Sequence, residues 1–114
     1  MVLPEGKIIS RTEKSVALEF SVPDTSPYFD GHFPEFSILP AVAQVDLILH
    51  FASLYLETGI VLSEIRRIKF SNLIRPYAPL LLNLEINNAI ISFKISSPDS
   101  EIVYSLGTLQ LTGG

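Results

Sequence analysis

The sequence predicts an α+β fold in which a curved antiparallel sheet wraps one long, mostly buried helix. The stretch that follows Pro40 contains no glycine or proline until Gly59, and it is apolar around most of its helical circumference. On both sides of it lie short segments with strand-like patterns, separated by turn residues. Strand material, one helix and then a run of strands indicate two layers that shield each other's apolar faces.

The first strands are expected at residues 7–11 and 15–22. In the second of these, apolar residues alternate with more polar ones, which is typical of a half-buried strand: Val16, Leu18, Phe20 and Val22. Four further strands are expected at residues 61–70, 80–87, 89–96 and 101–111. Asn87-Asn88 and Pro98-Asp99 are expected to form hairpin turns between them.

Residues 23–37 form a loop, because they hold three prolines, a glycine and two aspartates. Phe29, Phe33 and Phe36 indicate that one side of this loop packs against the protein. Pro40 suits the first turn of the helix, which should then run for about 18 residues, or roughly 27 Å.

Composition bounds the function. The chain has 114 residues, of which 47% are hydrophobic and 18% charged, so we expect a single folded domain over residues 1–114. A domain this small has little room for both a core and a deep cavity, so a substrate site should borrow a wall from a second subunit.

The absence of cysteine excludes disulfides, thiolate nucleophiles and cysteine-based metal sites. It fits a reducing compartment, and without a secretion signal at the start we expect a cytoplasmic protein.

Charge argues against two classes of partner. The net charge of −4 does not favour nucleic acid. A membrane-spanning helix is also disfavoured, because Gln44, Asp46 and His50 would lie in hydrocarbon.

The charges are unevenly distributed along the chain, and no acidic residue occurs between Glu64 and Glu85. Within that stretch, four of the eight cationic residues fall in a span of ten positions and should create a locally positive field: Arg66, Arg67, Lys69 and Arg75.

His32 is the first candidate for catalysis. It lies in Gly31-His32-Phe33-Pro34, where glycine permits an unusual turn and proline restricts the exit, so its side chain should point in one fixed direction. An imidazole with a pKa of about 6.5 can accept and return a proton near neutral pH. A loop histidine by itself more often has a structural role.

Asp46 is the second candidate, because a carboxylate within an apolar helix must be paired, solvated or functional. It belongs to a polar stripe on one helix face, formed by Asp46, His50, Ser53 and Glu57. That stripe either faces water or lines a substrate channel, and the residues alone leave both interpretations open. A metal site made of His32, Asp46 and His50 is less favoured, because no HExxH-like motif supports it.

The string FDGHFPEFSILPAVAQVDLILHFA resembles the signature of the bacterial β-hydroxyacyl-acyl-carrier-protein dehydratases of the hotdog fold. In that family the GHFP histidine is catalytic and an acidic residue follows it by fourteen positions, which matches His32 and Asp46. PAVAQVDLILHFA is most similar to the branch found in aryl-polyene and related pigment gene clusters, and IRRIKFSNLIRP resembles the family's third strand. The chain departs from the family pattern at Glu35, Ser37 and Ala41, the last of which replaces a glycine.

The resemblance implies dehydration of a 3-hydroxyacyl thioester, carried on acyl carrier protein, to the trans-2-enoyl thioester. His32 would remove the C2 proton, the amides of Ala41 and Val42 would hold the carbonyl oxygen, and Asp46 would act on the leaving hydroxyl. Such an elimination requires no metal or redox cofactor. Further residues are expected to contact the substrate: Phe29, Phe33 and His50.

The resemblance also implies a homodimer, with His32 and Asp46 of one site coming from different protomers. The cationic cluster would then steer an acidic carrier protein that delivers its acyl chain on phosphopantetheine, although solubility and edge protection explain single members equally well. Two other functions compete: a hotdog thioesterase, in which a carboxylate directs water at the carbonyl, and a non-catalytic acyl-binding homologue.

Overall fold

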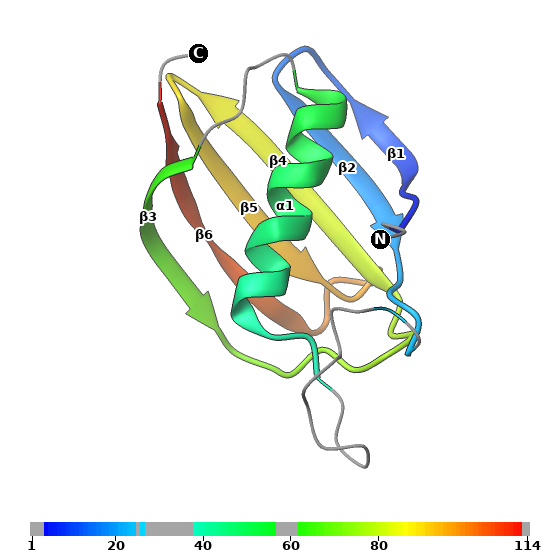
Figure 1. The fold of residues 1–114 in the computed structure, drawn as a ribbon. Helices are drawn as coiled ribbons and strands as arrows, with labels where there is room; N and C mark the ends of the chain where they lie inside the picture. The colour runs from blue at the N-terminus through cyan, green and yellow to red at the C-terminus, as the bar shows by residue number, and fades with distance from the viewer. Residues whose placement is uncertain (1–3, 25, 27–37, 57–61, 113–114) are drawn as a thin grey trace.

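The computed structural model describes residues 4–24, 26, 38–56 and 62–112. Within these residues, a six-stranded antiparallel sheet curves around one helix, as Figure 1 shows. The helix is α1 (Ala41–Tyr55), and the strands follow the order β1-β2-β4-β5-β6-β3 across the sheet. Their bounds are β1 (Lys7–Arg11), β2 (Ser15–Phe20), β3 (Leu62–Phe70), β4 (Leu80–Asn87), β5 (Ile90–Ser96) and β6 (Val103–Leu111).

The core lies between α1 and the concave face of the sheet. The alternation predicted for the second strand is observed, because Val16, Leu18 and Phe20 are buried while the residues between them are less so. The ring of Phe20 packs against Phe51 of the helix, with centroids 5.1 Å apart. Seven helix residues are buried on this side: Ala43, Gln44, Val45, Leu47, Ile48, Phe51 and Ala52.

The β4–β5 hairpin turns one residue later than the sequence suggested. Asn87 still pairs with Ile90 in the ladder, and the turn residues are Asn88 and Ala89. Both have positive φ angles, 50° and 64°, as a two-residue hairpin turn of this hand requires. The β5–β6 turn occurs at Pro98-Asp99 as expected, and the Ser97 hydroxyl donates to the Asp99 carboxylate at 2.6 Å.

Helix α1 begins as predicted after Pro40 but is shorter than the expected 18 residues. It has 15 residues, and Leu56 leaves it in an extended conformation with φ −110° and ψ 128°. Leu56 is itself buried, and its extended backbone ends the helix at that point. Across the described ranges, no helix has the length and apolarity that a bilayer crossing needs.

The helix is also less enclosed than its apolar circumference suggested. The sheet covers only one side of it, so outward apolar residues such as Val42 and Leu54 are exposed, Val42 at 82%. In the single chain the sheet therefore wraps one side of the helix, as expected, and leaves the outward side open. An exposed apolar helix surface beside a sheet edge is typical of a face that another protein covers.

Candidate active site

The candidate site is built around the start of α1. Pro40 precedes the helix with φ −72° and ψ 163°, and it makes no side-chain capping bond. The first helical hydrogen bond runs from the Gln44 amide to the Pro40 carbonyl, at 3.0 Å. The amides of Ala41 and Val42 thus belong to the group that has no acceptor within a helix, and they carry the positive end of its dipole. A helix start of this kind can bind a developing negative charge.

Strand β3 forms the opposite wall, and its shape depends on two irregularities. Its register against β6 shifts between Leu62 and Glu64 and again between Ile65 and Arg67. A strict alternation would place Leu62 and Ile65 on opposite faces of the sheet. With the extra residues, the apolar residues of β3 pair with β6 residues of a single face: Leu62 with Leu111, Ile65 with Leu109, Ile68 with Gly107, and Phe70 with Ser105.

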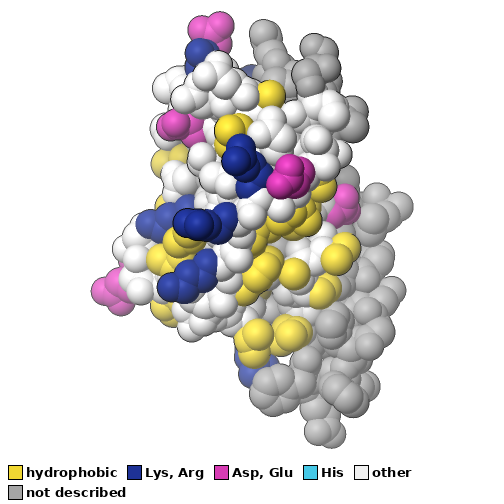
Figure 2. Space-filling view, turned by 90° about the vertical axis from the view of Figure 1, so that its left-hand side faces the viewer, with side chains coloured by type: hydrophobic (Ala, Val, Ile, Leu, Met, Phe, Trp, Pro, Cys, Tyr) yellow, Lys and Arg dark blue, Asp and Glu magenta, His cyan; other side chains and the backbone are white. Residues whose placement is uncertain are grey.

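Between these two elements lies an apolar cleft of about 480 Å³. Figure 2 shows the apolar surface on this side of the molecule. Three lining residues come from the first turns of α1 and four from β3: Ala41, Val42, Val45, Leu62, Ile65, Ile68 and Phe70. The predicted thioester-binding residues Ala41 and Val42 therefore line a space suited to an alkyl chain.

Asp46 lies beside this cleft on the same helix face, since it follows Val42 by one turn. Its side chain is exposed, because the sheet leaves this face of the helix open in the single chain. His50, one turn further along, is half-buried, and its ring packs against Phe51 with centroids 5.2 Å apart. Ser53 is exposed, and its hydroxyl donates to the His50 carbonyl at 2.8 Å.

Several predicted site residues lie outside the described residues: His32, Phe29 and Phe33, as well as Glu35, Ser37 and Glu57. The pairing of His32 with Asp46 therefore stays a prediction, and so does the metal-site interpretation, which includes His32.

The cationic cluster is partly assembled. Arg67 and Lys69 pair with alternate residues of β6, Thr108 and Leu106, so both lie on the face opposite the cleft. Arg66 occupies an irregular position, and its guanidinium donates to the Gln110 side-chain oxygen at 3.3 Å. Figure 2 shows dark-blue side chains gathered beside the apolar surface. Arg75 is exposed as well but belongs to the segment between β3 and β4.

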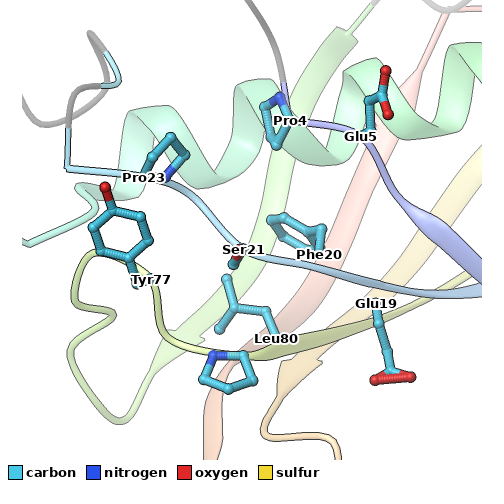
Figure 3. A pocket seen from close by; sticks show the side chains of 9 residues that line it. Pro4, Glu5, Glu19, Phe20, Ser21, Pro23, Tyr77 and Leu80 are labelled. Carbon is cyan, nitrogen blue, oxygen red and sulfur yellow. The ribbon is translucent and has the colours of Figure 1, made fainter.

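A second, larger cleft of about 630 Å³ lies near the start of β4. Figure 3 shows its walls, which combine aromatic and apolar residues with two carboxylates: Pro4, Glu5, Glu19, Phe20, Ser21, Pro23, Tyr77, Pro79 and Leu80. The Tyr77 hydroxyl donates to Asp24 at 3.0 Å, and this bond raises the pKa of Tyr77. None of these described lining residues was predicted to carry chemistry.

The sequence analysis missed two features of the site. The apolar wall of β3 was hidden because its irregularities break the period of two. The buried side chain of Gln44 was considered only as an argument against a membrane span, although a polar residue on the core face of a helix is itself a signal.

Comparison with known proteins identifies the family. A model of the ApeI-like family, described as ApeI dehydratase, matches residues 8–107. The chain belongs to the ApeI dehydratase family. The resemblance drawn from the GHFP and PAVAQVD motifs is thereby confirmed. A search of the curated proteins found no match.

Solved structures place this dehydratase in the hotdog fold. It is similar to a protein in the structure of the dehydratase heterocomplex ApeI:P from Xenorhabdus doucetiae, at 26% identity over 96% of this chain and 98% of that one, with a TM-score of 0.85. An uncharacterized protein from Erwinia carotovora subsp. atroseptica is 30% identical over 98% of both chains, with a TM-score of 0.77. Zebra fish thioesterase superfamily member 2 shares the fold alone, at 15% identity over 96% of this chain and 81% of that one, with a TM-score of 0.65.

Proposed function

We propose that this dehydratase removes water from a 3-hydroxyacyl thioester carried on acyl carrier protein and forms the trans-2-enoyl thioester. One observation carries the proposal: the start of α1, without a side-chain cap, lines an apolar cleft, and Asp46 follows the lining residue Val42 by one helical turn. The helix start would bind the thioester carbonyl, and the cleft would hold the acyl chain. The carboxylate of Asp46 would lie beside the 3-hydroxyl.

In this mechanism His32 takes the C2 proton while the electron pair of that bond forms the C2–C3 double bond. The amides of Ala41 and Val42 stabilise the negative charge that develops on the carbonyl oxygen. Asp46 holds the C3 hydroxyl and gives it the proton with which it leaves as water. Solvent then returns the proton held by His32 to Asp46, so the net reaction is loss of water alone.

A dimer of two copies of this chain is the proposed active unit. Two observations support a partner subunit that covers the cleft. Apolar residues around the cleft are exposed, namely Val42 at 82%, Ile65 at 52% and Phe70 at 45%. Strand β3 also lies at the edge of the sheet, where its backbone can pair with another strand. A partner lying across β3 would turn the open cleft into a tunnel, and a His32 that acts with Asp46 across protomers would come from that partner. The relative from Xenorhabdus doucetiae is one protein in the structure of a dehydratase heterocomplex. If the purified chain is monomeric and inactive and gains activity only when a related subunit is added, the active unit is a heterodimer and not a homodimer.

The direct test mixes the purified protein with 3-hydroxyacyl carrier protein of several chain lengths. Absorbance of the conjugated enoyl thioester and release of free thiol are followed in parallel. We expect enoyl product without thiol. Thiol release without enoyl product would identify a thioesterase, and acyl binding with neither product would identify a non-catalytic acyl-binding protein.

Ala41→Gly is expected to raise kcat/KM several-fold, up to about 10-fold, because the Ala41 methyl group narrows the approach of the carbonyl to the helix start. Ala41 is exposed, so its methyl group contributes little packing. Ala41→Val should move kcat/KM in the opposite direction, as measured by enoyl absorbance under identical conditions. Equal values for all three proteins would show that this side chain does not limit access.

Charge reversal of Arg67 and Lys69 to glutamate is expected to raise KM for the carrier-bound substrate about 10-fold, with a smaller effect at high salt. The KM for the same acyl group on free pantetheine should not change, because that substrate lacks the acidic protein. Lys7→Glu is the matched control, since Lys7 is an exposed cation on β1 at the other edge of the sheet. An equal rise in KM with Lys7→Glu would indicate a general charge effect.

A further inference from the structure

Gln44 is a polar residue on the core face of α1, where an unpaired amide would be costly to bury. It is 4% exposed, and both ends of its side chain are bonded. Its Nε2 donates to the Leu39 carbonyl at 3.1 Å, and its Oε1 accepts from the hydroxyl of Ser105 at 2.8 Å. Ser105 lies on β6 and is completely buried. The side chain therefore ties the helix to the sheet and to the segment that leads into the helix.

Leu39 is held at both of its backbone groups. Its amide donates to the Ile74 carbonyl at 2.8 Å, and its carbonyl accepts from Gln44. The next residue, Pro40, has a φ angle restricted by its ring, and Ala41 follows directly. The position of the first helical amides thus depends on where the Leu39 carbonyl is held.

This arrangement secures the helix start without occupying its amides. A serine, threonine or aspartate at the position of Pro40 would accept a hydrogen bond from the second or third helical amide, Val42 or Ala43. Proline offers no such acceptor, and Gln44 instead donates to the Leu39 carbonyl in the segment before the helix. The amides at the start of α1 remain available to a ligand.

We propose that Gln44 is a positioning residue: by holding the Leu39 carbonyl it aims the Ala41 and Val42 amides at the thioester oxygen. This inference rests on the proposed function, because it assigns those amides to the substrate carbonyl. Gln44 itself touches no reacting atom. Its effect passes through Leu39 and Pro40.

The test reads the carbonyl directly. A saturated acyl-pantetheine thioester, labelled with ¹³C at the carbonyl, cannot eliminate water and so stays intact when bound. In the wild-type protein we expect its infrared carbonyl stretch to fall relative to the free thioester, because the two amides polarise the bond. Gln44→Met keeps the side-chain length but removes both hydrogen bonds. It should abolish this shift and lower kcat about 10- to 100-fold, with a smaller change in KM.

Ser105→Ala is the matched control, because it removes a buried hydrogen bond from the same amide but leaves the bond to Leu39. It should lower the melting temperature to a degree comparable with Gln44→Met, yet keep the infrared shift and a kcat within a few-fold of wild type. The proposal would be overturned if Gln44→Met and Ser105→Ala lost kcat equally and both kept the infrared shift. Gln44 would then contribute to packing alone.

Gln44→Glu provides a second variant that retains size. Its protonated carboxyl can donate to the Leu39 carbonyl, whereas its carboxylate cannot. The ratio of its kcat to that of wild type should therefore rise as the pH falls, together with the infrared shift. A ratio that does not change with pH would contradict the proposal. A wild-type protein that shows neither enoyl product nor infrared shift would overturn the proposed function instead, since an active wild type is the premise of every comparison here.

Discussion

His32→Ala and Asp46→Asn are each expected to lower kcat for dehydration by about 10²–10⁴-fold, because each removes one of the two proton transfers of the elimination. The double variant should be little worse than the poorer single variant, since the two groups act on one concerted set of bonds. Enoyl absorbance under single-turnover conditions measures the chemical step. A second polar residue of the same helix face, Ser53, supplies the control Ser53→Ala, which should retain wild-type kcat.

Mixing these two inactive variants tests the shared site. If His32 and Asp46 of one site belong to different protomers, a mixed dimer has one site with both residues and one site with neither. Random exchange of subunits makes half of all dimers mixed, so the mixture should recover about one quarter of wild-type activity. If both residues come from one chain, every site lacks one of them and the mixture stays inactive. The two variants are incubated together until their subunits exchange, and enoyl absorbance is then measured for the mixture and for each variant alone.

The mixing experiment matters because Asp46 is exposed in the single chain. The sequence left open whether the helix face with Asp46 meets water or lines a substrate channel. An apolar surface that a second subunit covers has the same composition as a core, so the sequence cannot distinguish them. The open apolar face of the helix and the expectation of a second subunit thus have one physical origin.

Other parts of the fold were predictable because they depend on local signals. Pro40 correctly predicted where the helix begins, and the β4 range of 80–87 was predicted without error. The end of the helix was not, because Leu56 leaves it to fill the core and no glycine or proline marks that point. The wall formed by β3 also escaped prediction. Its apolar residues follow steps of three, three and two, and only the pairing with β6 shows that they share a face.

Gly107 is the residue on which that pairing most depends. A methyl group added at this position would overlap the Arg67 carbonyl oxygen and lie 2.8 Å from the Ile68 Cα, and both are backbone atoms of β3. Backbone atoms in a ladder cannot rotate away as a side chain can. Glycine at this position therefore permits the close approach of β3 to β6 that places Ile68 in the wall of the cleft.

Gly107→Ala is accordingly expected to reduce the free energy of unfolding by about 1–3 kcal/mol or more, because β3 must move outward to accommodate the methyl group. The displaced strand would also distort the cleft and the edge on which the proposed dimer forms, so activity and dimer content should fall together. Urea unfolding and analytical ultracentrifugation measure the two effects. Gly6→Ala is the comparison: its methyl group would meet only core side chains, the Leu18 Cδ1 at 2.5 Å and the Phe51 ring at 3.2 Å, and no backbone atom of β3. If Gly107→Ala were as stable and as dimeric as Gly6→Ala, β3 would have to be free to shift, and a rigid cleft wall on this strand would be excluded.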